Sequence, residues 1–449
     1  MNILKQSNNL KDYLPNFALL FILLLSLTLE TYSQNKVALA LEECIKIGLE
    51  NNKAIKISKS KVESASAKSK ETDASLLPSL KFNGGYTRLS EVDPFEVNTP
   101  YGKMSISTQV FDVFTLRLSA SQPIFTGYRL QNSSDMMELQ KAASENDYMA
   151  DLGNLTFDIK NAYWNLYKAL EYYKSIKSNK EMMQAHLDDI QNFYDAGMAL
   201  FNDVLKVKVQ LANTDLMLLD AENAINLSMI SLNTIIGLPI DTKIEILTMM
   251  DTNIVNIPDV NLLLDTALVN RPELKGMELR VKAIENSVNI AKSGWYPQIF
   301  ASANYYFNKP NSRIMPTRNE FIGTWDIGIT ISYDVFNWLT VPHQVEQAQA
   351  SLNQTILGLQ QLKDVISLEV SQNYLSLKKA IDKIRVARVA DEQAKENVRI
   401  TKEKFLAGLA TNTDLLDAEN ASLVADINLI NSYIDYEINY SKLLKSLGK

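Results

Sequence analysis

The sequence predicts a mainly helical protein with a small β part, built from two copies of one unit. Three observations predict this fold: long segments without proline, short segments with strand-like alternation, and a match of the chain with itself. The 449 residues include only 15 Gly and 12 Pro to interrupt regular structure. Hydrophobic side chains make up 46% of the chain and charged ones 22%, so the chain can bury a core and is not compositionally disordered.

Residues 1–33 have the pattern of a secretory signal peptide. Lys5 and Lys11 precede an apolar or hydroxyl run at 17–29, and small and polar residues follow it up to Ser33. A helix of that length spans about 20 Å, less than the ~30 Å hydrocarbon core, so a transmembrane anchor is the less favoured alternative. We expect an exported chain that, lacking another apolar run of transmembrane-helix length, has to use strands for any membrane insertion.

Self-comparison divides the rest of the chain into two copies, residues 34–240 and 258–449, joined by a linker at 241–257. At a shift of 219, Pro78 and Tyr86 match Pro297 and Tyr305. From Phe125 onward the match continues without a gap at a shift of 211. This second shift pairs Phe125 with Phe336, Tyr163 with Tyr374, Gly197 with Gly408, and Asp203 with Asp414. The change of shift predicts a loop in the first copy that is eight residues longer.

The sequence of each copy predicts a helical segment, two strands, a long helix and a return helix. The expected segments are helices at 38–75 and 260–292, strands at 79–89, 115–125, 298–307 and 325–335, and long helices at 128–196 and 340–407. Residues 325–335 alternate almost without exception, so one face of this strand is apolar and the other polar. Aromatic residues at the strand ends are typical of the girdles of membrane barrels, and a half-buried soluble sheet is the alternative. They are Phe300, Tyr306, Phe307, Trp325, Phe336 and Trp338.

The long helices are predicted by the absence of proline between Pro123 and Pro239 and from His343 onward. Each would measure about 100 Å if unbroken, so each has to pack along partner helices. Gly197 and Gly408 are expected to end these helices as left-handed caps.

The turns after these glycines differ between the copies. In the second copy, Thr411 and Asp414 have the spacing of a capping box in which Asp replaces Glu. In the first copy Leu200 stands where the second has Thr411, so we expect Asn202 to cap the return helix.

Charge and motifs exclude several functions. The formal net charge of −7 provides no basic excess for phosphates, which argues against a nucleic-acid partner. A single cysteine, Cys44, excludes an internal disulfide, and the two histidines, His186 and His343, are too few and too far apart for a Cys/His zinc site. Phosphate-loop, dinucleotide-binding and hydrolase motifs are absent from the sequence. We therefore predict no enzymatic activity, no cofactor and no metal site, with both histidines on helix surfaces.

The ordered set of features resembles the outer-membrane efflux (TolC) family over nearly the whole exported chain. It comprises the signal peptide, the duplicated plan, the strand entries LPSL and YPQI, the segment SQPIFTGYR, and the two Gly-x5-Asp-[Val/Leu]-Leu turns. The resemblance implies a homotrimer whose strands close a twelve-stranded outer-membrane barrel. It further implies an α-helical barrel that extends across the periplasm.

The same resemblance implies the partners. These are outer-membrane lipid, a periplasmic adaptor (membrane fusion protein) and an inner-membrane transporter. Adaptor contacts are expected at Gly197, Met198, Leu200, Asp203, Gly408, Leu409, Thr411 and Asp414. Because the first turn departs from the second at Leu200, its adaptor contact is the weaker inference.

We therefore expect a passive exit duct of a tripartite efflux or type I secretion system, located in the outer membrane with a long periplasmic extension. The alternative is a periplasmic coiled-coil scaffold or adaptor protein without a pore. The resemblance implies that the pore narrows near the helical turns. Asp188, Asp189 and Asp195 lie close to the first of these turns and could form acidic rings that favour cations. Solvated helix faces are the plainer interpretation of these carboxylates. The exported substrate, the pump class and the adaptor's identity do not follow from the sequence.

Overall fold

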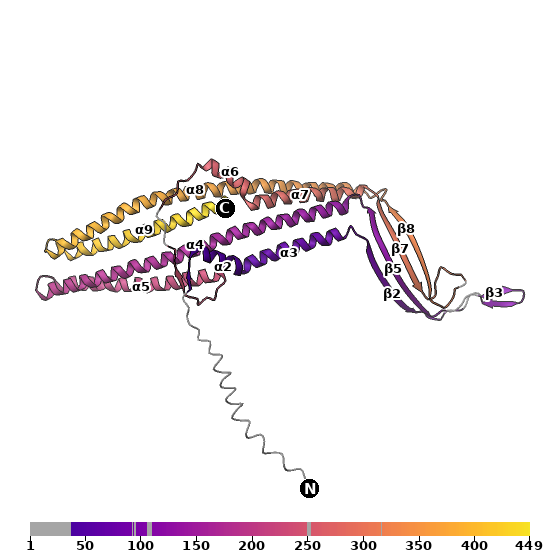
Figure 1. Cartoon of the computed structure of the whole chain (residues 1–449), viewed down its shortest axis with the longest axis horizontal. Helices are drawn as coiled ribbons and strands as arrows, with labels where there is room; N and C mark the ends of the chain where they lie inside the picture. Colours follow the sequence, from indigo (N-terminus) through magenta and orange to yellow (C-terminus); the bar gives the residue numbers. More distant parts are fainter. Residues whose placement is uncertain (1–36, 92, 94–95, 106–109, 249–252, 316) are drawn as a thin grey trace, which may run out of the picture. The chain divides into compact units, whose positions relative to one another are not determined.

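The computed structural model describes residues 37–91, 93, 96–105, 110–248, 253–315 and 317–449 (Figure 1). The predicted signal peptide at 1–33 lies outside these residues. The chain forms two compact units. The tip unit comprises the described parts of Met1–Asn51, Ile159–Thr252 and Ala390–Asn431, and the sheet unit those of Asn52–Asp158, Asn253–Val389 and Ser432–Lys449. Each unit contains parts of both sequence copies, so the boundaries of the copies stay a prediction.

Helices dominate the structure, as predicted. The helices are α2 (Leu41–Asn51), α3 (Lys53–Ala74), α4 (Arg129–Asp195), α5 (Phe201–Ile236), α6 (Val260–Asn270), α7 (Pro272–Lys292), η1 (Ser293–Trp295), α8 (Thr340–Leu406) and α9 (Asn412–Ser446). The strands are β1 (Val37–Leu39), β2 (Ser79–Arg88), β3 (Glu96–Thr99), β4 (Gly102–Ser105), β5 (Asp112–Phe125), β6 (Ile244–Ile246), β7 (Gln298–Asn308) and β8 (Ile322–Ser332). The long helices α4 and α8, each of 67 residues, agree with the predicted segments at both ends.

The segments predicted to be helical at 38–75 and 260–292 are helical over nearly their whole length, and each is divided into two helices. Asn52 adopts an extended backbone, and its side chain accepts hydrogen bonds from the backbone N–H groups of Ala54 and Ile55, so a new helix starts after it. Arg271 takes a ψ of 119° before Pro272, the first residue of α7. The ring of a proline disfavours helical backbone in the residue before it, which explains this second break.

The sheet unit holds a four-stranded antiparallel sheet in the order β2-β5-β7-β8 (Figure 1). The pairing of β5 with β7 joins strands of the two sequence copies. Because side chains alternate between the faces of a sheet, the register places one set of paired positions on each face. One face carries Leu80, Phe82, Leu116, Leu118, Tyr305, Trp325, Ile327, Ile329 and Ile331. The other carries Lys81, Asn83, Arg117, Ser119, Asn304, Tyr306, Asp326 and Thr330.

The predicted division into an apolar and a polar face is therefore confirmed. Of the strand-end aromatic residues, Phe300 and Tyr306 lie on the polar face, because the register pairs them with Thr330 and Thr324. The guanidinium groups of Arg117 and Arg313 lie over the ring of Tyr306, at 5.3 and 4.4 Å from its centroid. On the same polar face Asn304 accepts a hydrogen bond from Arg117 (2.8 Å) and donates one to Asp326 (2.7 Å). The polar face thus carries a connected network of charged and amide groups.

Two further features of the sheet unit were not predicted. The extra residues of the first copy contain a small hairpin, β3 and β4, where the sequence indicated only a longer loop. The turns from sheet to long helix both use two consecutive residues in the left-handed region: Gly127 and Tyr128 (φ 62° and 64°), and Trp338 and Leu339 (φ 50° and 62°). These pairs are related by the shift of 211, so the two copies share this turn.

Among the helices of the described residues, none combines the length and the apolar character needed to cross a membrane.

The left-handed turn after β5 predicts a stability effect. A Cβ at Gly127 would lie 2.7 Å from the carbonyl oxygen of Ser293, and φ is positive there, so Gly127→Ala should destabilise by about 1–3 kcal/mol. Gly153→Ala is the matched control, because Gly153 is helical with open space around its Cβ position and should stabilise by about 0.5–1 kcal/mol. The measurement is the midpoint of thermal unfolding of detergent-extracted protein, followed by circular dichroism. Equal midpoints for the two variants would contradict this account of the turn.

Candidate functional site at the hairpin tips

The tip unit contains the ends of two helical hairpins, α4–α5 and α8–α9. We call residues 197–203 the first tip and residues 408–414 the second tip. Gly197 and Gly408 have φ values of 75° and 72°, which confirms the predicted left-handed caps. The N–H of Met198 donates to the carbonyl of Phe193 (2.8 Å), and that of Leu409 donates to the carbonyl of Lys404 (2.8 Å). Both long helices therefore end in the same hydrogen-bonded turn.

The return helices begin differently in the two tips. Asp414 accepts hydrogen bonds from the backbone N–H of Thr411 (2.8 Å) and from its hydroxyl (2.7 Å), and the N–H of Asp414 donates to that hydroxyl oxygen (3.2 Å). The predicted capping box is thus present, and these bonds from Thr411 lower the pKa of Asp414. In the first tip, Leu200 is the cap residue and supplies no side-chain bond. The prediction that Asn202 caps α5 was wrong, because the helix begins at Phe201 and Asn202 already lies inside its first turn.

Both tips expose large apolar side chains. Met198 and Leu200 are each 71% exposed and Leu409 is 79% exposed, and Phe201 is exposed beside them. A cleft of about 570 Å³ lies between the tips. Its lining combines apolar side chains with polar groups: Ile190, Phe193, Met198, Ala199, Asp203, Lys206, Phe405, Leu406, Ala407, Gly408, Ala410, Thr411, Asn412 and Thr413. The arrangement suits an amphipathic surface of a partner protein.

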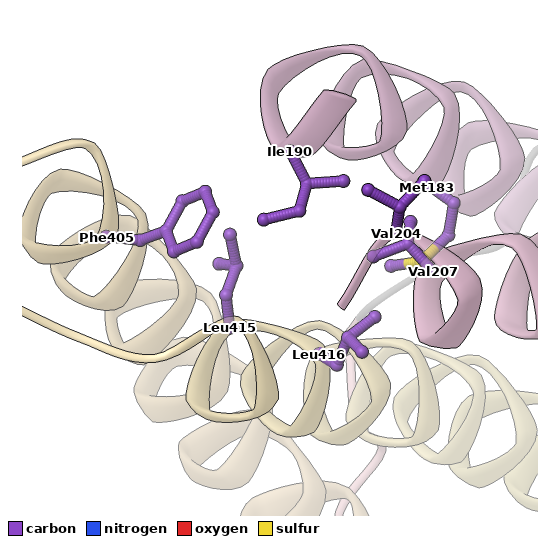
Figure 2. Packing of buried hydrophobic residues seen from close by; sticks show 7 residues of the cluster. All are labelled: Met183, Ile190, Val204, Val207, Phe405, Leu415 and Leu416. Atoms are coloured by element: carbon purple, nitrogen blue, oxygen red, sulfur yellow. The ribbon is translucent and has the colours of Figure 1, made fainter. Parts of the chain in front are cut away.

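An apolar cluster behind the cleft joins the four helices that carry the tips. It consists of Met183 and Ile190 from α4, Val204 and Val207 from α5, Phe405 from α8, and Leu415 and Leu416 from α9. Figure 2 shows these side chains pointing toward one another from their helices. The tips are therefore held on a packed base, although the turns themselves are exposed.

His186 lies beside this cluster, and the prediction that it occupies a helix surface was wrong. It is 2% exposed, and its imidazole packs edge-on against the ring of Phe405, with centroids 5.3 Å apart. Its Nδ1 is 2.9 Å from Oε2 of Glu419, and its Nε2 is 2.9 Å from Oδ1 of Asn412. His343, in contrast, lies on the surface of α8 as predicted.

A signal for this buried site was present in the sequence. His186 follows Met183 by three residues and precedes Ile190 by four, the spacing of one helix face, and all three are buried. Glu419 likewise continues the spacing of Leu415 and Leu416. Treating each polar residue singly, rather than by the face that it shares with apolar neighbours, misses the site.

The acidic residues near the first tip lie toward solvent. Asp188 and Asp195 are exposed and Asp189 is half-buried. Asp188 accepts a hydrogen bond from Gln184 (3.1 Å), and Asp195 accepts one from Gln191 (3.0 Å). Across the described residues, no three histidine, cysteine or acidic side chains group in a way that could hold a metal ion. Whether these aspartates line a pore stays a prediction.

Cys44 is buried in α2 of the tip unit. Burial, with smaller contributions from Glu43 and Glu42, raises the pKa of its thiol to about 12. The native thiol is therefore unreactive near neutral pH, which leaves introduced cysteines as selective labelling sites.

Comparison with known proteins identifies the family. A sequence profile described as outer membrane efflux protein matches residues 45–238 and again residues 263–449, so the chain belongs to the outer membrane efflux protein family. The double match fits the internal duplication. This is a family of channel proteins, and the chain is not an enzyme.

Individual relatives are distant in sequence and similar in fold. The chain is 22% identical to outer membrane protein TolC of Vibrio cholerae, over 84% of this chain and 83% of that protein. It is 20% identical to outer membrane protein TolC of Escherichia coli, over 95% of this chain and 85% of that protein. Among solved structures it is similar to the CmeC outer membrane channel of Campylobacter jejuni, with a TM-score of 0.78 and 18% identity, over 91% of this chain and 85% of that one.

Proposed function

We propose that the protein is the outer-membrane exit duct of a tripartite efflux or type I secretion system. The observation that carries the proposal is the four-stranded sheet, which has one apolar face, one polar face and two edge strands, β2 and β8. A sheet that enters lipid has to pair both edges, and four strands are fewer than the about eight needed to close a membrane barrel. Copies of the chain therefore have to complete it.

A homotrimer satisfies this requirement with twelve strands, and pairs β8 of each copy with β2 of the next. The apolar face, with Trp325, Ile327 and Ile329 exposed on it, then contacts outer-membrane lipid. The polar face, with its network around Asn304, lines the lumen. Each sequence copy, 34–240 and 258–449, supplies two of the strands and one long hairpin.

An exposed apolar stripe on α5 supports assembly in the tip unit as well. Its members recur at the spacing of a helix-packing seam: Leu205, Val209, Leu216, Leu219, Leu227 and Ile230. All are at least two-fifths exposed in the single chain. A second copy that covers this stripe would extend the helices into a closed tube that crosses the periplasm.

The tips are the proposed contact with a periplasmic adaptor, which couples the duct to an inner-membrane transporter. Exposed Met198, Leu200 and Leu409 flank the cleft, and Asp203, Thr411 and Asp414 supply polar groups beside them. An amphipathic helical hairpin matches this combination. The inner-membrane partner selects the cargo, so the duct itself needs no substrate site. A scaffold without a pore would have no use for an amphipathic sheet.

The adaptor contact predicts a position-specific crosslink. A photo-crosslinker attached to Leu409→Cys should capture a co-expressed periplasmic adaptor, because Leu409 is 79% exposed at the second tip. Val424→Cys is the control, since Val424 is an exposed apolar residue of α9 away from the turn. Buried Cys44 leaves the parent protein unlabelled. Mass spectrometry of the product identifies the partner, and equal capture from both positions, or from neither, would rule out the tip as the contact.

The acidic residues predict ion selectivity. If Asp188, Asp189 and Asp195 face the lumen of the assembled tube, replacing all three by Asn should lower the preference for cations over anions. The reversal potential across a planar bilayer under a salt gradient measures this preference. A variant with Asp241→Asn, outside the hairpins, serves as the control. An unchanged reversal potential in the triple variant would reject the acidic-ring proposal.

A further inference from the structure

We propose that His186, Glu419 and Asn412 form a proton-dependent latch that holds the two hairpin tips together and weakens as pH rises. One part of this proposal, that the latch regulates the inner end of the duct, rests on the proposed function. The latch itself is defined by contacts within the tip unit.

The three residues link three helices. His186 belongs to α4, and Glu419 and Asn412 belong to α9. The side-chain N–H of Asn412 also donates to the backbone carbonyl of Asp203 in α5 (3.3 Å). The network therefore ties the first hairpin to the start of the return helix in the second, directly behind the cleft.

The bonds fix how many protons the network holds. Because the amide nitrogen of Asn412 donates to Asp203, its oxygen is the atom that faces Nε2 of His186, so Nε2 has to carry a proton. A second proton has to lie between Nδ1 of His186 and the carboxyl group of Glu419. Whether this proton resides on the imidazole or on the carboxyl, the pair holds two protons in total.

Removing one of these protons breaks a bond in every arrangement. If Nδ1 keeps its proton for Glu419, the lone pair of Nε2 faces the oxygen of Asn412. If the amide of Asn412 turns to donate to Nε2, its oxygen faces the carbonyl of Asp203 and the link to α5 is lost. If Nε2 keeps its proton, the lone pair of Nδ1 faces a carboxylate.

Because the site is buried, the loss of one of these hydrogen bonds is costly. The side chains of His186 and Glu419 are 1% and 2% exposed, so water cannot replace a broken bond. The surrounding cluster of Figure 2 is apolar and comes from the same four helices. An unpaired polar atom at this site favours separation of the helices that enclose it.

Other charged groups do not substitute for this pair. α8 presents the uncharged ring of Phe405 to the imidazole. The charged residues within three positions of His186, Asp203, Phe405, Asn412 or Glu419 in the sequence are Asp188 and Asp189 on α4, Asp203 and Lys206 on α5, Lys402, Glu403 and Lys404 on α8, and Asp414 and Asp417 on α9. The carboxylate of Asp203 bonds to Lys206 (3.5 Å), and among the described residues Glu419 is the one charged side chain bonded to His186.

The test is hydrogen–deuterium exchange of the detergent-extracted full protein at about pH 6 and about pH 8.5, corrected for intrinsic exchange rates. Protection of the peptides that contain the two tips should fall at least about tenfold at the higher pH, as expected for the loss of one charge-assisted hydrogen bond. His343→Gln is the matched control and should behave like the parent, because His343 is exposed and its hydrogen-bond partner within the described part of the chain is Glu346 on its own helix (3.3 Å). His186→Gln should remove the pH dependence.

Glu419→Gln separates a proton-dependent latch from a purely structural contact. The amide of a glutamine can donate to Nδ1 of a neutral imidazole whose Nε2–H still donates to Asn412, so every bond is kept without the dissociable proton. This variant should remain protected at both pH values. Protection that is independent of pH in the parent, or that falls with pH in Glu419→Gln as it does in the parent, would overturn the proposal.

Bilayer recordings test the latch and the proposed duct separately. If the duct conducts, the parent's conductance should rise with pH and that of Glu419→Gln should not. Conductance that rises equally in both would overturn the latch. A protein with the predicted exchange pattern that passes no ions at any pH would contradict the proposed duct and support the latch alone.

Discussion

In lipid every backbone N–H and C=O group has to be hydrogen-bonded within the protein, and the proposed assembly follows from this requirement. Within the sheet each strand is hydrogen-bonded to its neighbours, and the outer edges of β2 and β8 are left for other strands. Water can satisfy such edges and hydrocarbon cannot. In the proposed duct, a chain with an apolar sheet face therefore depends on its copies, and assembly, membrane insertion and a lumen all follow from this one requirement.

The two long helices lead from the sheet to the hairpin tips. Both long helices leave it through turns of two left-handed residues, and both end at a left-handed glycine. Between these points α4 and α8 are continuous over 67 residues each. The sheet and the tips are thus connected by continuous helix in each sequence copy. Exposed large apolar side chains lie at the tips, on α5, on α8 and on the apolar face of the sheet.

Much of this fold could be predicted because it rests on patterns that extend over many residues. Missing prolines defined α4 and α8, strict alternation defined β8, and Gly408 with the Thr411 and Asp414 spacing defined the second tip. The helix breaks at 52 and 271 were missed because each depends on the backbone of one residue. The burial of His186 was signalled by the helix face that it shares with Met183 and Ile190, whereas its bond to Glu419 was not, because α9 is more than two hundred residues away in sequence. The acidic and adaptor-contact residues remain predictions, since their roles depend on neighbouring copies and partners.

The mass of the detergent-extracted protein tests the central claim most directly. Light scattering, corrected for bound detergent, should give three times the mass of one chain, with the strand content retained in circular dichroism. A mass of one chain with the same strand content would contradict the account, because the edges of β2 and β8 would then be tolerated without a partner strand.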